Sequence, residues 1–438
     1  MEFNGKHIAV LGAGKSGETA AILLAQLGAR VTLLDSTDSE AIRAKIVGLG
    51  IAAIELIAGP AAETDPTRYD LGVLSPGIDP VTPIVKNFAA KQIDLIGELE
   101  LGYQLCKCPV VAITGTNGKT TTTELVTRML NGCGQQTVAA GNIGTAFTGV
   151  VQGSDQLDLV TLEVSSFQLE TIRTFHPKVA AWLNLTPDHL DRYNSVEEYR
   201  DAKLRIFENQ TEDDFAVINL RDSLPPLKAK PITFSAYQSG GDFELREQTI
   251  YFRGNPVLAM QETFLRGPHN AENLMAALGI GFAWGLDFGQ MKEPLSTYRP
   301  LPHRCELIRT LDGVDYVNDS KATNIDALEK ALDTETRPVV LIAGGKDKGF
   351  DFESVTDLVA RKAHCVVLIG EMADSIAASW GPKVPCEKAC SLADAVTRAR
   401  ANARPGDVVL LSPGTSSFDM FKSYADRGNQ FRTLIESL

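Results

Sequence analysis

Residues that could hold a phosphate group stand together between Thr114 and Thr123, where the sequence reads TGTNGKTTTT. The apolar run Pro109 to Ile113 is typical of a buried strand, and the threonines after the loop open a helix. Backbone N–H groups of a glycine-rich loop and the positive end of a helix dipole attract a phosphate anion. Lys119 can then reach the terminal phosphates, and Thr120 can ligate magnesium. We therefore expect a nucleoside triphosphate here, although the first glycine lies three residues before Gly118 rather than five.

Composition places the chain among soluble globular proteins. Its 438 residues are too many for one hydrophobic core and indicate roughly two to four domains. Lys and Arg total 42 against 55 Asp and Glu, so the net charge of −13 argues against a nucleic-acid partner. The seven cysteines contain no paired CxxC set, which favours free thiols in a reducing cytoplasm. Without a signal-peptide pattern or a bilayer-length apolar run, we expect a cytoplasmic protein with no membrane insertion.

The first part, residues 1–97, has the pattern of a nucleotide-binding βαβ unit. A strand at His7 to Leu11 leads into GxGxxG from Gly12 to Gly17, and a second strand ends on Asp35, where an acidic residue often meets a ribose. This pattern fits a nicotinamide-dependent dehydrogenase, but it also fits other nucleotide-like ligands. The last glycine is explained as well by helix–strand packing as by ligand contact. The turn Ser75 to Gly77 could face a pyrophosphate.

The second part, residues 98–301, carries the phosphate loop. Glu163 ends an apolar strand, where phosphate-loop proteins place a magnesium carboxylate, and a solvated strand end is the alternative. His189 follows a further strand, so we favour a metal or substrate role over a surface position. Lys203 lies on a helix predicted from Val196 to Phe207, where spacing alone favours an ordinary surface lysine.

Two further segments of the second part have recognisable patterns. Apolar and polar residues alternate from Ser235 to Met260, which predicts a peripheral β-hairpin or meander. The polar residues from Gly267 to Asn273 are expected to cap a long apolar helix from Leu274 to Trp284.

The third part, residues 302–438, alternates strands and helices again. Apolar runs such as Val339 to Ile342 and Val408 to Leu411 are typical of parallel strands buried on both faces. The loops after them, 344–349 and 412–417, lie where ligands of open α/β sheets bind. The fold class is therefore α/β: a Rossmann-like N-terminal domain, a central P-loop ATPase-like domain with a mainly parallel sheet, and a Rossmann-like C-terminal domain. We expect their sites to face a shared cleft.

The order and spacing of these motifs resemble those of the Mur ligases over nearly the whole chain. The shared motifs are TGTNGKTTT, LEVSSFQLE at 162–170, NLTPDHLDRY at 184–193, AKLRIFEN at 202–209, HN..N at 269–273, PHR at 302–304 and NDSKATN at 318–324. The GxGxxG and SPG segments in front, with GGKDKG at 344–349 and SPGTSSFD at 412–419 behind, are similar to those of the members that add D-glutamate to UDP-N-acetylmuramoyl-L-alanine in peptidoglycan synthesis.

The resemblance implies a reaction through an activated carboxylate. In this family, ATP phosphorylates the alanyl carboxylate, the D-glutamate amine attacks, and phosphate leaves from a tetrahedral intermediate. The implied catalytic residues are Lys119, His189 and Lys203. Two magnesium ions are implied, with Thr120 and Glu163 at the first, and with His189 and Lys203 as its N-carbamate at the second. A carbamate offers magnesium an anionic oxygen, whereas an ammonium would repel the ion.

The resemblance also distributes the binding residues among the three parts. It places ATP against Gly115, Thr116, Asn117, Gly118, Lys119, Thr120, Thr121, Asn273, Arg304 and Asp319. It places the UDP-sugar, without any nicotinamide, against Gly14, Lys15, Ser16, Asp35, Ser36, Gly77, Asn142 and His189. It places D-glutamate against Thr323, Lys348, Ser417 and Tyr424. We expect a monomer that takes these small molecules as its partners.

Other functions stay open beside this hypothesis. Another Mur-type amino-acid ligase would share most of the motifs. Folylpolyglutamate synthase also has a GTNGKTT loop and adds glutamate, but its loop usually lies close to the N-terminus, whereas here a whole nucleotide-type domain precedes it. A nicotinamide-dependent oxidoreductase would leave the phosphate loop, Glu163 and NDSKATN without a role. A non-catalytic nucleotide sensor is disfavoured because every phosphate and metal position of the family is filled.

Overall fold

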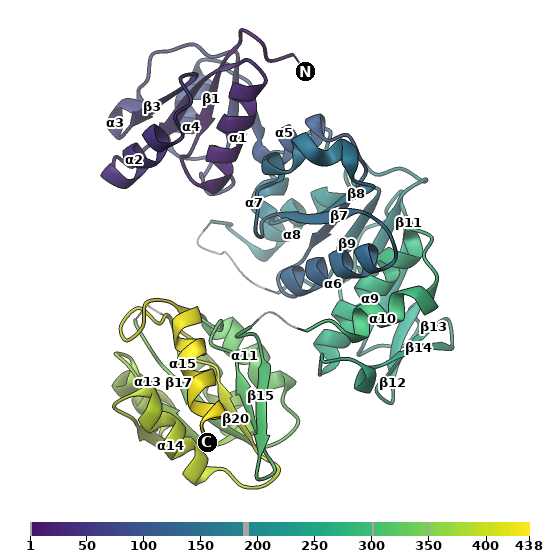
Figure 1. Ribbon diagram of the computed structural model, residues 1–438, viewed down its shortest axis with the longest axis vertical. Helices are drawn as coiled ribbons and strands as arrows, with labels where there is room; N and C mark the ends of the chain where they lie inside the picture. Colours follow the sequence, from purple (N-terminus) through teal and green to yellow (C-terminus); the bar gives the residue numbers. More distant parts are fainter. Residues whose placement is uncertain (1, 187–191, 300–301, 348–349) are drawn as a thin grey trace. The chain divides into compact units, whose positions relative to one another are not determined.

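The structure, a computed structural model of the 438-residue chain, describes residues 2–186, 192–299, 302–347 and 350–438. The chain divides into two compact units (Figure 1). The first comprises Met1–Thr263 and His269–Tyr298, and the second comprises Phe264–Pro268 and Arg299–Leu438. Two β-sheets belong to the first unit and one belongs to the second.

The N-terminal part of the first unit is a five-stranded parallel sheet with helices on its faces. Its elements are β1 (His7–Leu11), α1 (Lys15–Gln26), β2 (Arg30–Asp35), α2 (Glu40–Gly48), β3 (Ile54–Ala58), α3 (Pro60–Glu63), β4 (Leu71–Leu74), α4 (Pro83–Ala90), β5 (Leu95–Gly97) and α5 (Glu98–Leu105). The strand order is β3-β2-β1-β4-β5. Because successive side chains of a strand point to opposite faces, Ile8 and Val10 pack with α1, whereas Ala9 and Leu11 pack with α4.

The central part of the chain forms a larger sheet. Its elements are β6 (Val110–Thr114), α6 (Lys119–Gly132), β7 (Thr137–Gly141), β8 (Leu159–Glu163), α7 (Ser166–Leu169), β9 (Val179–Trp182), α8 (Val196–Leu204), β10 (Phe215–Asn219), β11 (Lys230–Ser235), β12 (Phe243–Arg246), β13 (Thr249–Phe252), β14 (Asn255–Ala259), α9 (Pro268–Ala283) and α10 (Phe288–Ser296). The nine strands lie in the order β14-β13-β12-β11-β10-β9-β6-β8-β7. Neighbours from β7 to β12 pair in parallel, and β12, β13 and β14 form the antiparallel meander that the alternating pattern predicted.

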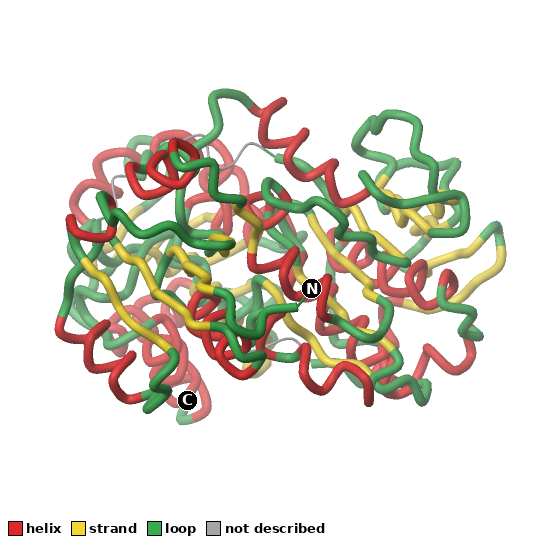
Figure 2. Tube along the Cα trace, turned by 90° about the horizontal axis from the view of Figure 1, so that it is seen from above, coloured by secondary structure: helices red, strands yellow, loops and turns green. Residues whose placement is uncertain are grey.

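The second unit is a six-stranded sheet covered by helices on both faces. Its elements are β15 (Glu306–Leu311), β16 (Val314–Asn318), α11 (Ile325–Thr334), β17 (Val339–Ala343), α12 (Thr356–Lys362), β18 (Ala363–Leu368), α13 (Ala373–Trp380), β19 (Cys386–Lys388), α14 (Leu392–Asn402), β20 (Val408–Leu411) and α15 (Tyr424–Glu436). The order is β15-β16-β20-β17-β18-β19, and within this described sheet only the β15–β16 pair is antiparallel. Leu341 packs with α11 to α13, whereas Val340 and Ile342 pack with α14 and α15. Figure 2 colours the helices, strands and loops of the whole chain.

Most predicted strands occupy the expected residues, and β1 and β20 do so at both ends. Helix α9 differs, because it begins at Pro268 rather than at Leu274, so the polar residues His269 to Asn273 form its first turns. Proline favours the first helical position, since its ring fixes φ and its missing N–H is not needed there. The helix predicted from 196 to 207 ends at Leu204 and continues as a 3-10 turn.

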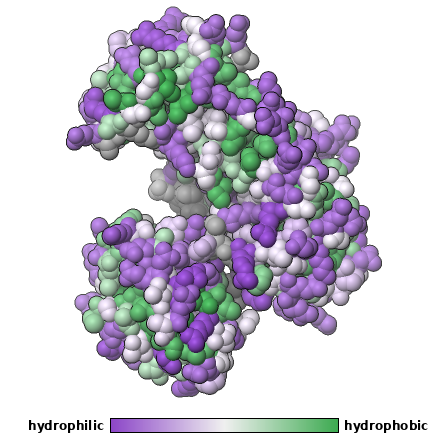
Figure 3. Space-filling view, in the orientation of Figure 1, coloured by the Kyte–Doolittle hydropathy of each residue, from purple (hydrophilic) through white to green (hydrophobic). Residues whose placement is uncertain are grey.

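The described surface and core show an ordinary division of polarity. The face seen in Figure 3 is covered mostly by hydrophilic residues, with hydrophobic ones in separate patches. The largest fully buried side chains include Trp182 and Trp380, one in each unit. Among the described helices, none combines the length and the apolar character needed to cross a bilayer.

We expect the substitution Gly17→Ala to destabilise the N-terminal sheet. A Cβ at Gly17 would lie 1.8 Å from the carbonyl oxygen of Gly12, so the backbone would have to shift. Overpacking of this kind costs about 1–3 kcal/mol, and the thermal midpoint should fall. Gly14→Ala is the matched control, because a Cβ there meets no atom within 4 Å and φ is already −67°. Equal midpoints for the two variants would contradict the packing role of Gly17.

Candidate active site

The phosphate loop connects the end of β6 with the start of α6. Gly118 adopts a φ of +80°, and a Cβ there would lie 2.3 Å from Oδ1 of Asn273 on α9. The same oxygen accepts a hydrogen bond from the Thr122 hydroxyl at 3.2 Å. Glycine therefore lets the loop pass close to Asn273 and turn into the helix. Residues Lys119 to Thr121 form the first turn of α6, whose N–H groups have no partners within the helix and are suited to an anion.

The loop is braced by the segment that follows β9. The Asn184 carbonyl accepts the N–H of Thr116 at 3.0 Å, and its Oδ1 accepts the N–H of Asn117 at 2.9 Å. The Thr116 hydroxyl donates to the Thr186 carbonyl at 3.1 Å and lies 3.3 Å from the Tyr199 hydroxyl. The sequence analysis gave Asn184 and Thr186 no role, although both belong to the NLTPDHLDRY motif. Their hydrogen bonds are to Thr116 and Asn117, which are distant in the sequence, and such contacts leave no local pattern.

Two lysines converge on one carbonyl oxygen of the loop. The Lys119 ammonium donates to the carbonyls of Gly115 and Thr116, each at 2.8 Å. Lys203 on α8 is only 1% exposed and donates to the same Gly115 oxygen at 2.9 Å. Its ammonium also lies 4.6 Å from the ring centroid of Tyr199. Lys203 is therefore not an ordinary surface lysine, and the loop gathers positive charge in an acidic chain.

Glu163 lies at the end of β8, beside β6, with 3% exposure, so it is not a solvated strand end. Its Oε1 accepts a hydrogen bond from the Asn142 side-chain amide at 2.8 Å. Its buried Oε2 has no hydrogen-bond partner among the described residues. A buried carboxylate oxygen left unpaired is costly unless a donor or a cation binds it. The carboxylate of Glu163 therefore fits a hard cation such as magnesium.

In the N-terminal sheet, Asp35 shapes the GxGxxG loop. Its carboxylate accepts the N–H of Ala13 and the N–H of Thr37, each at 2.8 Å. Lys15 begins α1, and its ammonium donates to the carbonyl of Gly144 in the central part. The loops after β1, β2 and β4 and the first turn of α1 also contain the predicted residues Gly14, Ser16, Ser36 and Gly77.

A loop of the central part, residues 142–148, joins the GxGxxG helix to Glu163. It begins with Asn142, which holds the Glu163 carboxylate, and it ends with Thr148. The hydroxyl of Thr148 lies 3.0 Å from that of Thr19 on α1. The N–H and hydroxyl of Thr148 both lie 2.7 Å from Oε1 of Glu98, a fully buried carboxyl whose pKa is raised by burial. The sequence gave no reason to single out Thr19, Glu98 and Thr148, since these residues are far apart in the chain.

In the second unit, Asp319 is buried between the loops that follow β16 and β20. Its carboxylate accepts the Ser412 hydroxyl at 2.8 Å and the N–H of Cys305 at 3.2 Å. Burial raises the pKa of Asp319 to about 7 despite these bonds. Between pH 3.8, the ordinary pKa of an aspartate, and about pH 7, the folded chain keeps a proton on Asp319 that the unfolded chain has lost. The contribution of Asp319 to the free energy of unfolding therefore falls as the pH rises through this range. In the neighbouring PHR motif, the buried Nε of Arg304 has no hydrogen-bond partner among the described residues.

Arg427 on α15 ties two candidate binding loops together from a fully buried position. Its guanidinium donates to the Ser320 hydroxyl at 2.9 Å, to the Ser320 carbonyl at 2.8 Å and to the Thr415 carbonyl at 3.4 Å. Burial lowers the pKa of Arg427 to about 10, which still leaves it charged at neutral pH. The two loops and the start of α15 carry the predicted residues Thr323, Ser417 and Tyr424.

The structure thus groups the predicted residues by unit. Within the first unit, Lys119, Lys203 and Glu163 belong to the phosphate loop and its neighbouring elements. Two predicted residues, His189 and Lys348, lie outside the described residues.

Three family models match the chain in sequence order. The Mur ligase MurD-like N-terminal domain matches residues 6–97, the Mur ligase middle domain matches residues 113–281, and the Mur ligase glutamate ligase domain matches residues 303–414. The chain is 40% identical over 448 residues to the UDP-N-acetylmuramoylalanine--D-glutamate ligase of Geotalea daltonii, covering 100% of this chain and 99% of that protein. It is 41% identical over 448 residues to the protein of the same name from Trichlorobacter lovleyi, covering 100% of both.

Solved structures share the fold at lower sequence identity. UDP-N-acetylmuramate-alanine ligase MurC from Thermotoga maritima matches with a TM-score of 0.60 and 18% identity over 99% of each chain. MurF ligase from Thermotoga maritima in complex with ADP matches with a TM-score of 0.60 and 17% identity over 99% of this chain and 96% of that one. The predicted three-domain α/β architecture with mainly parallel sheets is confirmed. From the family models and the full-length identity together, the chain belongs to the Mur ligase family, in its MurD-like group.

Proposed function

We propose that this chain uses ATP to join D-glutamate to UDP-N-acetylmuramoyl-L-alanine, a step in peptidoglycan precursor synthesis. The observation that carries the proposal is the phosphate loop with a buried lysine and a buried carboxylate beside it, in a chain that matches D-glutamate ligases along its full length. A carboxylate is a poor electrophile, so the amide bond requires an activated acid. Phosphorylation gives an acyl phosphate, the amine attacks it, and phosphate leaves from a tetrahedral intermediate.

The first task of the site is to hold ATP and to balance its charge. The loop N–H groups and the Lys119 ammonium would contact the phosphates, which makes phosphoryl transfer mainly a matter of position and charge. Asn273 borders the loop at Gly118 and is assigned to the adenine side. In the second unit, Arg304 is assigned to the terminal phosphates and Asp319 to the ribose. The unpaired Nε of Arg304 supports an anionic partner.

We assign two magnesium ions to the site, which would supply neutralisation of the phosphate charge. Glu163 and Thr120 would hold the first, and the unpaired Oε2 of Glu163 supports this assignment. His189 and the N-carbamate of Lys203 would hold the second. The burial of Lys203 beside a second ammonium supports the carbamate, because carboxylation exchanges a cation for an anionic oxygen ligand.

The two remaining substrates are assigned to different units. The nucleotide end of the UDP-sugar would lie at the GxGxxG loop, with Asn142 toward the sugar. The hydrogen bonds that link loop 142–148 both to α1 and to Glu163 support a ligand that extends from one region to the other. D-glutamate carries two carboxylates, and the hydroxyls of Thr323 and Ser417 with the Lys348 ammonium are suitable donors for them. Tyr424 would close that pocket.

The proposed reaction is tested by measuring phosphate release from ATP with magnesium and UDP-N-acetylmuramoyl-L-alanine. We expect release to depend strictly on D-glutamate, with L-glutamate inactive, because the amino-acid pocket must fix the α-amine against the activated acid. Release without either glutamate isomer would point to hydrolysis rather than ligation. If neither isomer supports release in a protein that still binds ATP, the D-glutamate assignment is wrong, and folate substrates and other amino acids become the candidates.

We expect Lys119→Ala to lower kcat by about 100-fold or more, because a preorganised charge at the transferring phosphoryl group is lost. Lys292→Ala is the control, since this half-exposed lysine on α10 pairs with Glu262 rather than with the loop. Steady-state phosphate release measures both variants. Near-normal turnover of the Lys119 variant would exclude the proposed contact with the phosphates.

Lys203→Ala should lose activity and regain part of it when acetate or formate is added, because a small carboxylate can occupy the place of the carbamate. The Lys119→Ala variant should show no such recovery, since its lost group is a cation. The measurement is kcat as a function of carboxylate concentration at constant ionic strength. Equal responses of the two variants would count against a carbamate at Lys203.

A further inference from the structure

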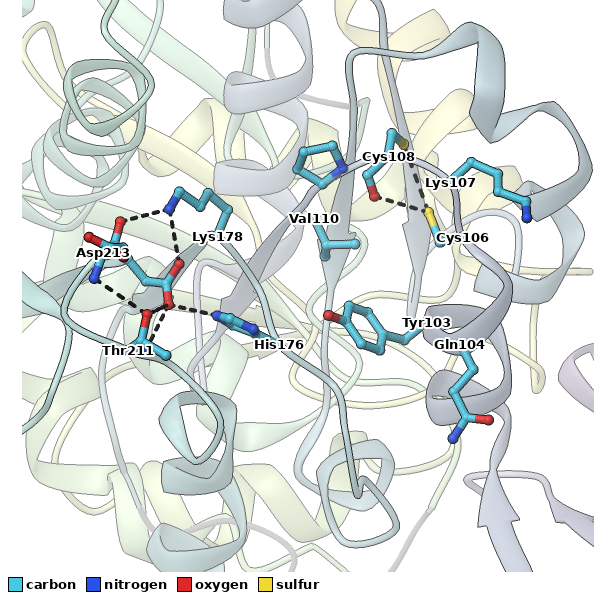
Figure 4. Close-up of a pocket in the computed structure, with 12 residues that line it drawn as sticks. Tyr103, Gln104, Cys106, Lys107, Cys108, Val110, His176, Lys178, Thr211 and Asp213 are labelled. Carbon is cyan, nitrogen blue, oxygen red and sulfur yellow. Dashed lines mark hydrogen bonds and ion pairs between the residues drawn. The ribbon is translucent and has the colours of Figure 1, made fainter. Parts of the chain in front are cut away.

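A pocket of about 570 Å³ lies in the first unit where β6 begins, at the strand end opposite the phosphate loop. Figure 4 shows two thiols on one side of it, those of Cys106 and Cys108, and a charged cluster on the other. The cysteines belong to the short segment between the end of α5 and the start of β6. Neither residue has a role in the proposed ligase reaction.

The two thiols contact each other. Their sulfurs are 3.8 Å apart, and the Cys106 thiol also donates to the Cys108 carbonyl at 3.4 Å. This is the one thiol–thiol hydrogen bond among the described residues, although the chain has seven free cysteines. Both side chains are partly exposed and line the pocket, so a reagent in solution can reach them.

The charged side of the pocket is already satisfied. Asp214 pairs with His176 at 2.6 Å and with Lys178 at 3.2 Å. Although burial opposes it, hydrogen bonds from Thr211 and His176 hold the pKa of Asp214 at about 2. Asp214 therefore stays ionised and paired at neutral pH, which leaves the thiols as the reactive groups. Figure 4 shows the Lys107 side chain pointing away from both sulfurs.

We propose that Cys106 and Cys108 are a thiol-modification site that closes to a reversible disulfide by exchange with a low-molecular-weight disulfide. The distance between the sulfurs, their shared pocket and the short intervening chain carry this inference. A disulfide needs the two sulfurs, which are 3.8 Å apart here, to approach to about 2 Å. The inference does not rest on the proposed ligase reaction.

The exchange proceeds in two balanced steps. The Cys106 thiolate attacks one sulfur of the external disulfide, so a mixed disulfide forms and one external thiolate leaves. The Cys108 thiol then loses its proton to solvent and attacks the Cys106 sulfur, and the second external thiolate leaves. Two protein thiols are oxidised and one external disulfide is reduced to two thiols. Burial and the neighbouring Cys106 raise the pKa of Cys108, which favours Cys106 for the first attack.

The test treats the full-length chain with glutathione disulfide and maps the peptides by mass spectrometry without reduction. We expect the peptide with Cys106 and Cys108 to lose about 2 Da, the two thiol hydrogens, and to regain them with dithiothreitol. Closure removes two of the seven free thiols, and any further loss on titration reports modification of other cysteines such as Cys390. A Cys390→Ser variant is the matched control, because Cys390 is the exposed cysteine of the second unit and should not affect closure.

Single variants separate closure from simple adduct formation. Cys108→Ser should accumulate one glutathione moiety on Cys106, and Cys106→Ser should react more slowly. Persistent glutathione on the wild-type peptide without the 2 Da loss would overturn the proposal, as would an unreactive pair in a sample whose Cys390 is modified. The wild-type map decides the question even if a serine variant folds poorly.

Discussion

Two ammonium groups, those of Lys119 and Lys203, donate hydrogen bonds to the same carbonyl oxygen of Gly115. Like charges held this close disfavour one another unless an anion balances them. The carbonyls of the loop accept these hydrogen bonds and hold both ammonium groups beside it. The rest of the first unit keeps this arrangement in place: β6 and α6 position the loop, the Asn184 side chain braces it, and α8 brings in the buried lysine. Such preorganisation favours a phosphate anion over water.

The second unit uses buried ionisable groups in a related way. Asp319 and Arg427 are both enclosed, and each is held mainly by neutral hydroxyl, N–H or carbonyl groups rather than by a direct ion pair among the described contacts. Burial therefore shifts the pKa of Asp319 up to about 7 and that of Arg427 down to about 10. Both groups bond to the loop after β20, Asp319 at Ser412 and Arg427 at Thr415, and these hydrogen bonds tie it to the loop after β16.

Local patterns predicted most of the secondary structure, because short apolar runs and glycine-rich turns are recognisable from neighbouring residues in the sequence alone. They gave the strand, glycine loop and helix around Lys119, and they placed Glu163 at a strand end. They failed for features that depend on distant residues. The polar turns from His269 to Asn273 resembled a cap, yet they pack as helix beside the phosphate loop. Spacing alone made Lys203 a surface residue, because its burial depends on Tyr199 and on a loop 88 residues earlier.

The GxGxxG loop shows how one motif can serve different ligands. Its last glycine, Gly17, is required by the close approach of the Gly12 carbonyl, which is a packing constraint independent of any ligand. Each carboxylate oxygen of Asp35 accepts one hydrogen bond from a backbone N–H group, and these bonds shape the loop. The remaining lone pairs of the carboxylate can still accept hydrogen bonds from a ligand. The motif therefore specifies a rigid strand–loop–helix turn rather than a nicotinamide. The ligand depends on the elements that surround this turn. Here Lys15 and Thr19 form hydrogen bonds with the segment 142–148, and Asn142 of that segment donates to Glu163.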